Sequence, residues 1–132
     1  MDNWRDYAPL VLRLGVGVIF AMHGWQKLQG GLPGVTGLVQ SLGFPAPELF
    51  AVLLIAAELL GGIMLIVGFL TRWAAKSLVV VSLVALFMVH LPNGFFMSTG
   101  GYEFILLLLA GSASLALSGA GKWSLDRIVW KG

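Results

Sequence analysis

Six side chains that can ionise lie within otherwise apolar stretches of this sequence. They are Arg13, His23, Lys27, Glu58, His90 and Glu103. Charged groups are costly in an apolar environment, so each of these residues is a candidate for a functional role wherever its stretch is buried. Histidine, arginine and glutamate side chains form hydrogen bonds with carbonyl groups and transfer protons. Together they suit the binding of an amphipathic ring that carries carbonyl oxygens.

The stretches that hold these residues have the composition of membrane-spanning helices. Of the 132 residues, 58% are hydrophobic and 11% are charged, against roughly 45–50% and 25% in soluble domains. A spanning helix needs about 20 mostly apolar residues, and four stretches approach that length: 8–28, 47–70, 73–91 and 101–118. The length indicates one domain. We therefore predict an all-α, integral membrane four-helix bundle that forms a single transmembrane domain in contact with the lipid bilayer.

The positive charges predict the orientation of this bundle. One side of the four-span arrangement carries Arg5, Arg72, Lys76, Lys122, Arg127 and Lys131, and only Lys27 falls at the other side. Positively charged residues gather on the cytoplasmic side of membrane proteins. We therefore expect both chain termini and the turn at residues 71–72 to face the cytoplasm. The small net charge of +2 gives no sign of nucleic-acid binding.

Two segments outside the spans are predicted to form short helices. Val35, Leu38, Val39 and Leu42 have helical spacing within the glycine-rich segment 29–46. This segment should lie on the outer surface of the bundle. Ser124 is a suitable N-cap for the tail, which carries tryptophan and basic residues and should end in a short amphipathic segment at the cytoplasmic surface.

Four of the six polar residues share faces with small side chains, and His23 lies on the flank of one of these faces. On the first span, a stripe runs through Arg13, Gly17, Phe20, Gly24 and Lys27. On the second, Glu58 shares a face with Ala51, Gly61, Gly62 and Leu65, and on the fourth, Glu103 aligns with Leu107, Ala110 and Ser114. Small residues allow close helix packing, so these faces should point into the bundle. We predict that Arg13 and Glu58 contact each other there, either as a structural pair that sets helix register or as part of a site.

The positions of the polar residues along their helices predict a cavity in the outer half of the bundle. Its walls would include His23, Lys27, Glu58, His90 and Glu103, because lipid cannot satisfy their hydrogen bonds. The segment 29–46 would cover its mouth. Plainer readings remain open: Lys27 could extend to the membrane interface, Glu103 could stabilise a helix N-terminus, and His90 could end a helix. The whole set could also be a closed polar cluster that holds four helices in register.

The sequence limits the cofactors that such a cavity could hold. The chain has no cysteine, which excludes iron–sulfur ligation by thiolates. His23 and His90 could ligate a haem, but two isolated histidines favour haem b only weakly. No metal-ligand spacing motif is present, so we predict no metal site. A quinone fits an apolar pocket with a few hydrogen-bonding groups, and it is the cofactor we expect.

Three segments resemble the DoxX family of small membrane proteins. They read RLGVGVIFAMHGWQKL (13–28), ELLGGIMLIVGFLTRWAA (58–75) and GAGKWSLDR (119–127). The motif positions are occupied by Arg13, Gly24, Lys27, Glu58, Gly68, Arg72, Ser124 and Asp126. The resemblance covers nearly the whole chain in the right order. It implies a four-helix protein of the bacterial inner membrane, without agreed catalytic residues.

The resemblance implies two kinds of function. The naming member of the family is similar to a small subunit of a thiosulfate:quinone oxidoreductase, and another member anchors a complex with superoxide dismutase and a sulfurtransferase. We therefore expect a quinone-linked subunit of an oxidoreductase complex that works with a protein partner. The alternative is a non-catalytic anchor or assembly factor that docks a soluble enzyme. A homo-oligomer is compatible with both, whereas a transporter is disfavoured because no internal repeat is visible.

Overall fold

The computed structural model describes residues 3–130, and every regular element in that range is a helix. A 3-10 turn, Trp4–Tyr7, leads into α1 (Ala8–Gly30), which is followed by α2 (Leu32–Ser41) and α3 (Pro47–Val67). Next come α4 (Thr71–Val84), a π-helical segment (Ala85–His90) and α5 (Glu103–Ser118). The short helix α6 (Leu125–Val129) ends the described chain. The chain is thus an all-α integral membrane protein, as the sequence predicts.

Helix lengths within residues 3–130 fit membrane spans to different degrees. Three helices are long and apolar enough to cross a bilayer: Trp4–Gly30, Pro47–Val67 and Thr71–Asn93, which includes the π-helical segment. The fourth, α5, has 16 residues, or about 24 Å of helix. That is shorter than the roughly 30 Å hydrocarbon core. α5 can cross the bilayer only with help from its flanking turns or from local thinning.

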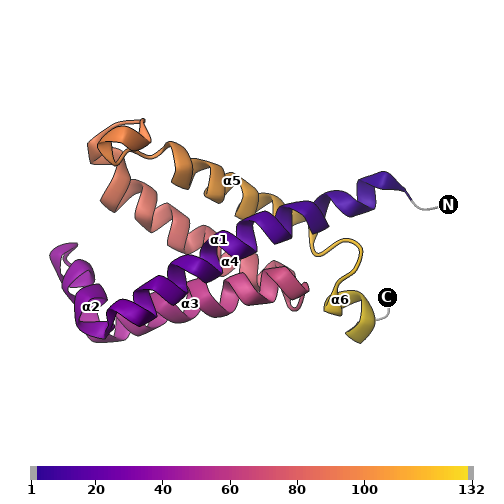
Figure 1. The fold of residues 1–132 in the computed structure, drawn as a ribbon, viewed down its shortest axis with the longest axis horizontal. Coiled ribbons are helices and arrows are strands. Elements are labelled where there is room, and N and C mark those ends of the chain that lie inside the picture. Colours follow the sequence, from indigo (N-terminus) through magenta and orange to yellow (C-terminus); the bar gives the residue numbers. More distant parts are fainter. Residues whose placement is uncertain (1–2, 131–132) are drawn as a thin grey trace.

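The helices are arranged as two layers that meet at one end of the molecule (Figure 1). α1 and α3 pack along each other, and the hairpin of α4 and α5 diverges from them toward the end that carries α2. Both ends of the described chain lie at the opposite end of the molecule. The basic residues of the turn after α3 and of the tail therefore share one end of the bundle. Lys131 lies outside the described residues, and the side of the membrane that each end faces stays a prediction.

Glycines allow α1 and α3 to approach closely. A Cβ atom added to Gly62 would lie 2.4 Å from the backbone nitrogen of Ala21, and one added to Gly24 would lie 2.5 Å from that of Leu59. Both distances are shorter than any normal contact, so only glycine fits at these positions. The predicted inward stripes of α1 and α3 are confirmed, since Arg13, Gly17, Gly24 and Glu58 are all buried.

The predicted inward face of α5 is wrong. Leu107, which the sequence places beside Glu103, is 67% exposed. The buried residues of this helix are Ile105, Leu108, Gly111, Ser112 and Leu115. α5 is apolar on all sides, so its sequence pattern does not reveal which face is buried. Packing decides it: a Cβ atom on Gly111 would lie 2.8 Å from the Val16 side chain of α1.

Candidate functional site

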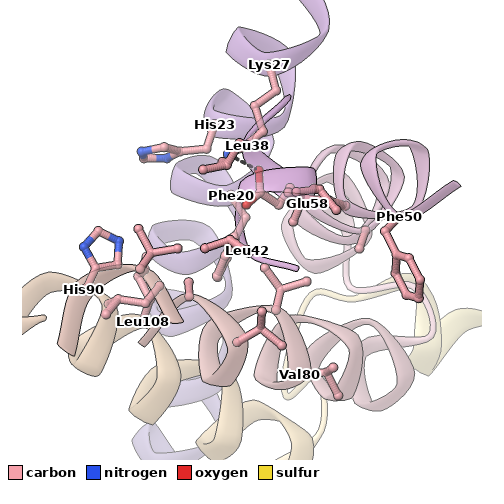
Figure 2. A pocket seen from close by; sticks show the side chains of 18 of the residues that line it. Phe20, His23, Lys27, Leu38, Leu42, Phe50, Glu58, Val80, His90 and Leu108 are labelled. Carbon is pink, nitrogen blue, oxygen red and sulfur yellow. Dashed lines mark hydrogen bonds and ion pairs between the residues drawn. The ribbon is translucent and has the colours of Figure 1, made fainter. Parts of the chain in front are cut away.

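A cavity of about 710 Å³ lies between the two diverging helix layers. Side chains from α1, α2, α3, α4, α5 and the π-helical segment line it (Figure 2). Its walls are mostly apolar and include Phe20, Val39, Leu54, Val81 and Leu108. The volume is that of a pocket for a drug-sized ligand. Four polar residues from the predicted wall line the cavity: His23, Lys27, Glu58 and His90.

The cavity holds one ion pair. Nζ of Lys27 donates a hydrogen bond to Oε2 of Glu58 at 2.7 Å, and the two side chains are 24% and 8% exposed. The pair connects α1 with α3 near the point where Gly24 lets the helices approach. An ammonium group has three donors, so two N–H groups of Lys27 remain for other partners. Lys27 therefore lines the interior instead of only reaching the interface.

His23 and His90 each use one ring nitrogen to fix the ring. Nδ1 of His23 donates to the carbonyl of Ile19 at 2.8 Å, and Nδ1 of His90 donates to that of Gly100 at 3.0 Å. A carbonyl can only accept, so Nδ1 carries the proton in both rings. In the neutral form of each ring, Nε2 is then an acceptor. Figure 2 shows both imidazoles on the same side of the cavity.

The π-helical segment determines where His90 lies. α4 is regular through Val84 and then widens into the π-helix Ala85–His90, before the short 3-10 turn Leu91–Asn93. π-helical turns are rare and are frequent at functional sites. Ala85, Val89 and His90 of this segment all line the cavity. The sequence predicts a helix through residue 91 but contains no signal for the wider turn.

α2 lies in the segment 29–46, which the sequence predicts to cover the mouth, and forms part of the wall at one end of the cavity. Val35 and Val39 of α2 pack with Ala51 and Ile55 of α3 in a small apolar cluster. Leu38, Val39 and Leu42 line the cavity. The apolar cluster therefore holds α2 against α3, and Val39 belongs both to this cluster and to the wall of the cavity.

The predicted contact between Arg13 and Glu58 is wrong. Arg13 is fully buried but does not line the cavity. Its guanidinium donates five hydrogen bonds of 2.8–3.2 Å, all to backbone carbonyls: those of Leu65, Ile66, Ala120, Lys122 and Trp123. The α3 carbonyls belong to the last turn of that helix, where a cation is favourable. Glu58 is closer along the bundle to Lys27, and it pairs with that residue.

Glu103 also lies outside the cavity, contrary to prediction. It begins α5, and its Oε1 accepts a hydrogen bond from the backbone N–H of Met97 at 3.1 Å. It therefore orders the connection that precedes α5 and is a first-turn acid at the positive end of the helix dipole. The plainer reading of Glu103 is the correct one.

Five motif residues form a capping cluster at the end that carries the termini: Arg13, Gly68, Arg72, Ser124 and Asp126. The carboxylate of Asp126 accepts from the backbone N–H groups of Leu70 and Thr71 at 2.6 and 3.0 Å. It thereby caps α4, and Leu70 can adopt a left-handed conformation with φ of 47°. Arg72 donates to the carbonyls of Leu117 and Ser118 at the end of α5.

The turn between α3 and α4 is shaped by this cluster. Gly68 has φ of 71°, and a Cβ atom there would lie 2.5 Å from the guanidinium of Arg13. α4 consequently begins at Thr71, two residues before the predicted start. Ser124 caps α6, as predicted, by accepting from the backbone N–H of Arg127. The capping role of Asp126 was missed, and no local signal could have indicated it, because Leu70 is 56 residues away in the sequence.

The fold and the cavity define a helical integral membrane protein with an apolar pocket that contains a few polar groups. A profile of the DoxX family matches residues 8–91. The chain is 36% identical to CatD of Bacillus subtilis (strain 168) over 132 residues, covering 100% of this chain and 94% of the relative. It is 30% identical to the inner membrane protein YqjF of Escherichia coli (strain K12), covering 99% and 98%. The chain therefore belongs to the DoxX family.

An uncharacterized membrane protein of Mycobacterium tuberculosis (strain ATCC 25618 / H37Rv) is 33% identical over 132 residues, covering 92% of this chain and 81% of that protein. The name of the Bacillus relative describes it as a provisionally assigned oxidoreductase. No solved structure matches the chain.

Proposed function

We propose that this protein is a quinone-binding subunit of an oxidoreductase complex in the bacterial inner membrane. The observation that supports this function most directly is the cavity itself. It combines apolar walls with one Lys–Glu pair and two oriented imidazoles. A quinone has the matching chemistry, because its ring is apolar and its two carbonyl oxygens are hydrogen-bond acceptors.

The polar residues of the cavity can bind such a ring and handle its protons. Lys27 would donate a hydrogen bond to one carbonyl through an N–H group that Glu58 does not use. A protonated imidazole of His23 or His90 would donate to the other through Nε2. Reduction of a quinone to a quinol takes up two electrons and two protons. Glu58 and the two histidines are groups that could exchange these protons at the site.

A protein partner would supply or accept the electrons. The chain has no cysteine and thus cannot carry a thiolate-bound iron–sulfur cluster. The name of the relative CatD refers to oxidoreductase activity, and this supports a role in a redox complex. We expect this chain to provide the quinone site and the partner to provide the electron path.

The location in the inner membrane is supported by the name of the relative YqjF. The distribution of basic residues adds an orientation, with the capping cluster at the cytoplasmic end and α2 at the outer end. Reporter fusions at Gly132 and Gly94 test this orientation. A reporter that is active only in the cytoplasm should work at Gly132 and fail at Gly94. Activity at Gly94 would reverse the proposed orientation.

Quinone binding to the purified protein tests the function. The unaltered protein should bind a quinone saturably, and Glu58→Gln should weaken binding at least tenfold. Glu48→Gln is the matched control, because Glu48 is on the same helix but does not line the cavity. If no quinone binds, either to the chain alone or in the presence of a partner, the proposal is wrong. A non-catalytic membrane anchor would then be the better description.

A further inference from the structure

The cavity has an opening in its side as well as at the end near α2. Two exposed apolar residues mark the side opening: Leu53 of α3 is 50% exposed and Val80 of α4 is 61% exposed. Leu38 and Met97 also line the cavity, and their exposed fractions of 43% and 51% mark the opening at the end near α2. A side chain that lines a cavity and is also open to the outside lies at the mouth of that cavity. The opening therefore lies between α3 and α4.

The packing of α3 and α4 explains why the opening lies there. The two helices are joined by the tight turn at Gly68–Leu70 and are in contact where Gly61 faces Leu78. Beyond that contact they diverge toward the end that carries α2 (Figure 1). On the opposite wall, Phe20 of α1 and Leu108 of α5 are buried, whereas His23 of α1 and Met97, which also line the cavity, are exposed nearer the end that carries α2.

The depth and chemistry of this opening identify what passes through it. α3 and α4 are membrane-spanning segments, and Val80 lies in the middle part of its span. The opening therefore faces the hydrocarbon of the bilayer and has an apolar rim. A hydrocarbon chain can occupy such an opening because it has no hydrogen bonds to leave unsatisfied there. A water-soluble molecule has no route through the hydrocarbon to this opening.

We propose that the ligand is a polyprenyl quinone, whose ring sits at Lys27 and Glu58 and whose isoprenoid tail leaves the cavity between α3 and α4. The inference rests on the proposed function and adds the class of quinone and its route. The cavity volume agrees with a ligand larger than one ring, because a single ring would leave much of the about 710 Å³ unfilled. The first isoprenoid units would occupy the apolar part of the cavity beside Leu54 and Val81.

Closing the opening tests the route. Leu53→Trp combined with Val80→Trp places two large side chains at the rim. The matched control is Ile63→Trp with Leu83→Trp, at exposed positions on the same helices that do not line the cavity. In nanodiscs, the rim variant should bind a benzoquinone with a ten-unit isoprenoid tail at least tenfold more weakly. The same ring without a tail should bind to it within about twofold of the unaltered protein, and the control should bind both normally.

A tail series on the unaltered protein gives a second measurement that does not depend on the folding of a variant. Dissociation constants for rings with zero, two and ten isoprenoid units are compared as mole fractions in the membrane, which removes the effect of partitioning. Affinity should rise at least tenfold from zero to two units. Equal affinities, or unchanged binding of the tailed quinone by the rim variant, would overturn this inference alone. Absence of binding by all quinones would overturn the proposed function and this inference with it.

Discussion

The capping cluster and the cavity use buried charges in opposite ways. In the capping cluster, Arg13 donates to five backbone carbonyls and Asp126 accepts from two backbone N–H groups, so both charges are occupied by helix ends and turns. In the cavity, Lys27 and Glu58 bind each other and border open space. Arg13 is fully buried, whereas the Lys27 side chain is 24% exposed. A charged residue within a membrane span is thus not by itself a sign of a ligand site.

The partners of each charge show which role it has. Backbone carbonyls near a helix C-terminus have no partner within the helix, and an arginine can satisfy several of them at once because its donors form a rigid fork. Such a cluster stabilises the fold and leaves no donor for a ligand. A lysine with one carboxylate partner keeps free donors. The capping cluster should therefore control stability, and the cavity residues should control binding.

Loss of Arg13 should have the largest effect on stability. Arg13→Leu leaves five carbonyls without their donor, two of them in buried and three in partly buried hydrogen bonds. Hydrogen bonds to charged groups contribute roughly 1.5–3 kcal/mol each, though not additively. We expect a loss of at least about 3 kcal/mol and poor recovery of folded protein. Arg13→Lys should rescue little, because an ammonium group cannot reproduce the fork. Thermal unfolding in detergent measures both variants. Normal stability of Arg13→Leu would show that the capping cluster is dispensable.

The close packing of α1 and α3 should be the next most sensitive feature. Gly62→Ala places a methyl group 2.4 Å from the backbone of Ala21, and overpacking typically costs about 1–3 kcal/mol. We expect a value near the upper end, since backbone atoms cannot move aside. Gly37→Ala is the control, because nothing lies within 4 Å of the added atom. Equal unfolding temperatures for the two variants would contradict the observed helix separation.

The Lys27–Glu58 pair should affect both stability and binding. Lys27→Met leaves a carboxylate unpaired; removal of one partner of a fully buried pair costs roughly 3–5 kcal/mol. We expect about 2 kcal/mol here, because Lys27 is partly exposed. Adding Glu58→Gln should recover much of that stability and still not restore quinone binding. A double-mutant cycle of thermal unfolding and binding measures both effects. If the double variant is less stable than Lys27→Met, the pair is not the reason for the loss.

The two histidines should have the smallest effect on stability. Their Nδ1 atoms form exposed hydrogen bonds to backbone carbonyls, so His23→Ala and His90→Ala should each cost less than about 1 kcal/mol. Quinone affinity should fall about tenfold in each case, because one ligand contact is lost. Glu103→Gln is the control, since Glu103 lies outside the cavity. A quinone affinity that changes in Glu103→Gln but not in the histidine variants would show that His23 and His90 do not contact the quinone.

Much of the fold could be predicted from the sequence because it depends on local properties. Apolar stretches bounded by proline and glycine indicated the helices, and the glycine stripes of α1 and α3 indicated their contact. The same reasoning found four polar residues of the cavity wall, because depth along a helix follows from residue number. It failed for α5, where every face is apolar and no stripe marks the buried side.

The partners of the charged residues were decided by tertiary structure. Composition and charge determined that this chain is a membrane protein and which residues are costly to bury. They could not determine that Arg13 reaches the segment after α5, because that segment is 107 residues away in sequence. Nor could they show the π-helical turn that places His90 at the cavity. A buried charge takes whichever partner the packed helices bring within about 3 Å, and that distance is set by the whole bundle rather than by any one helix.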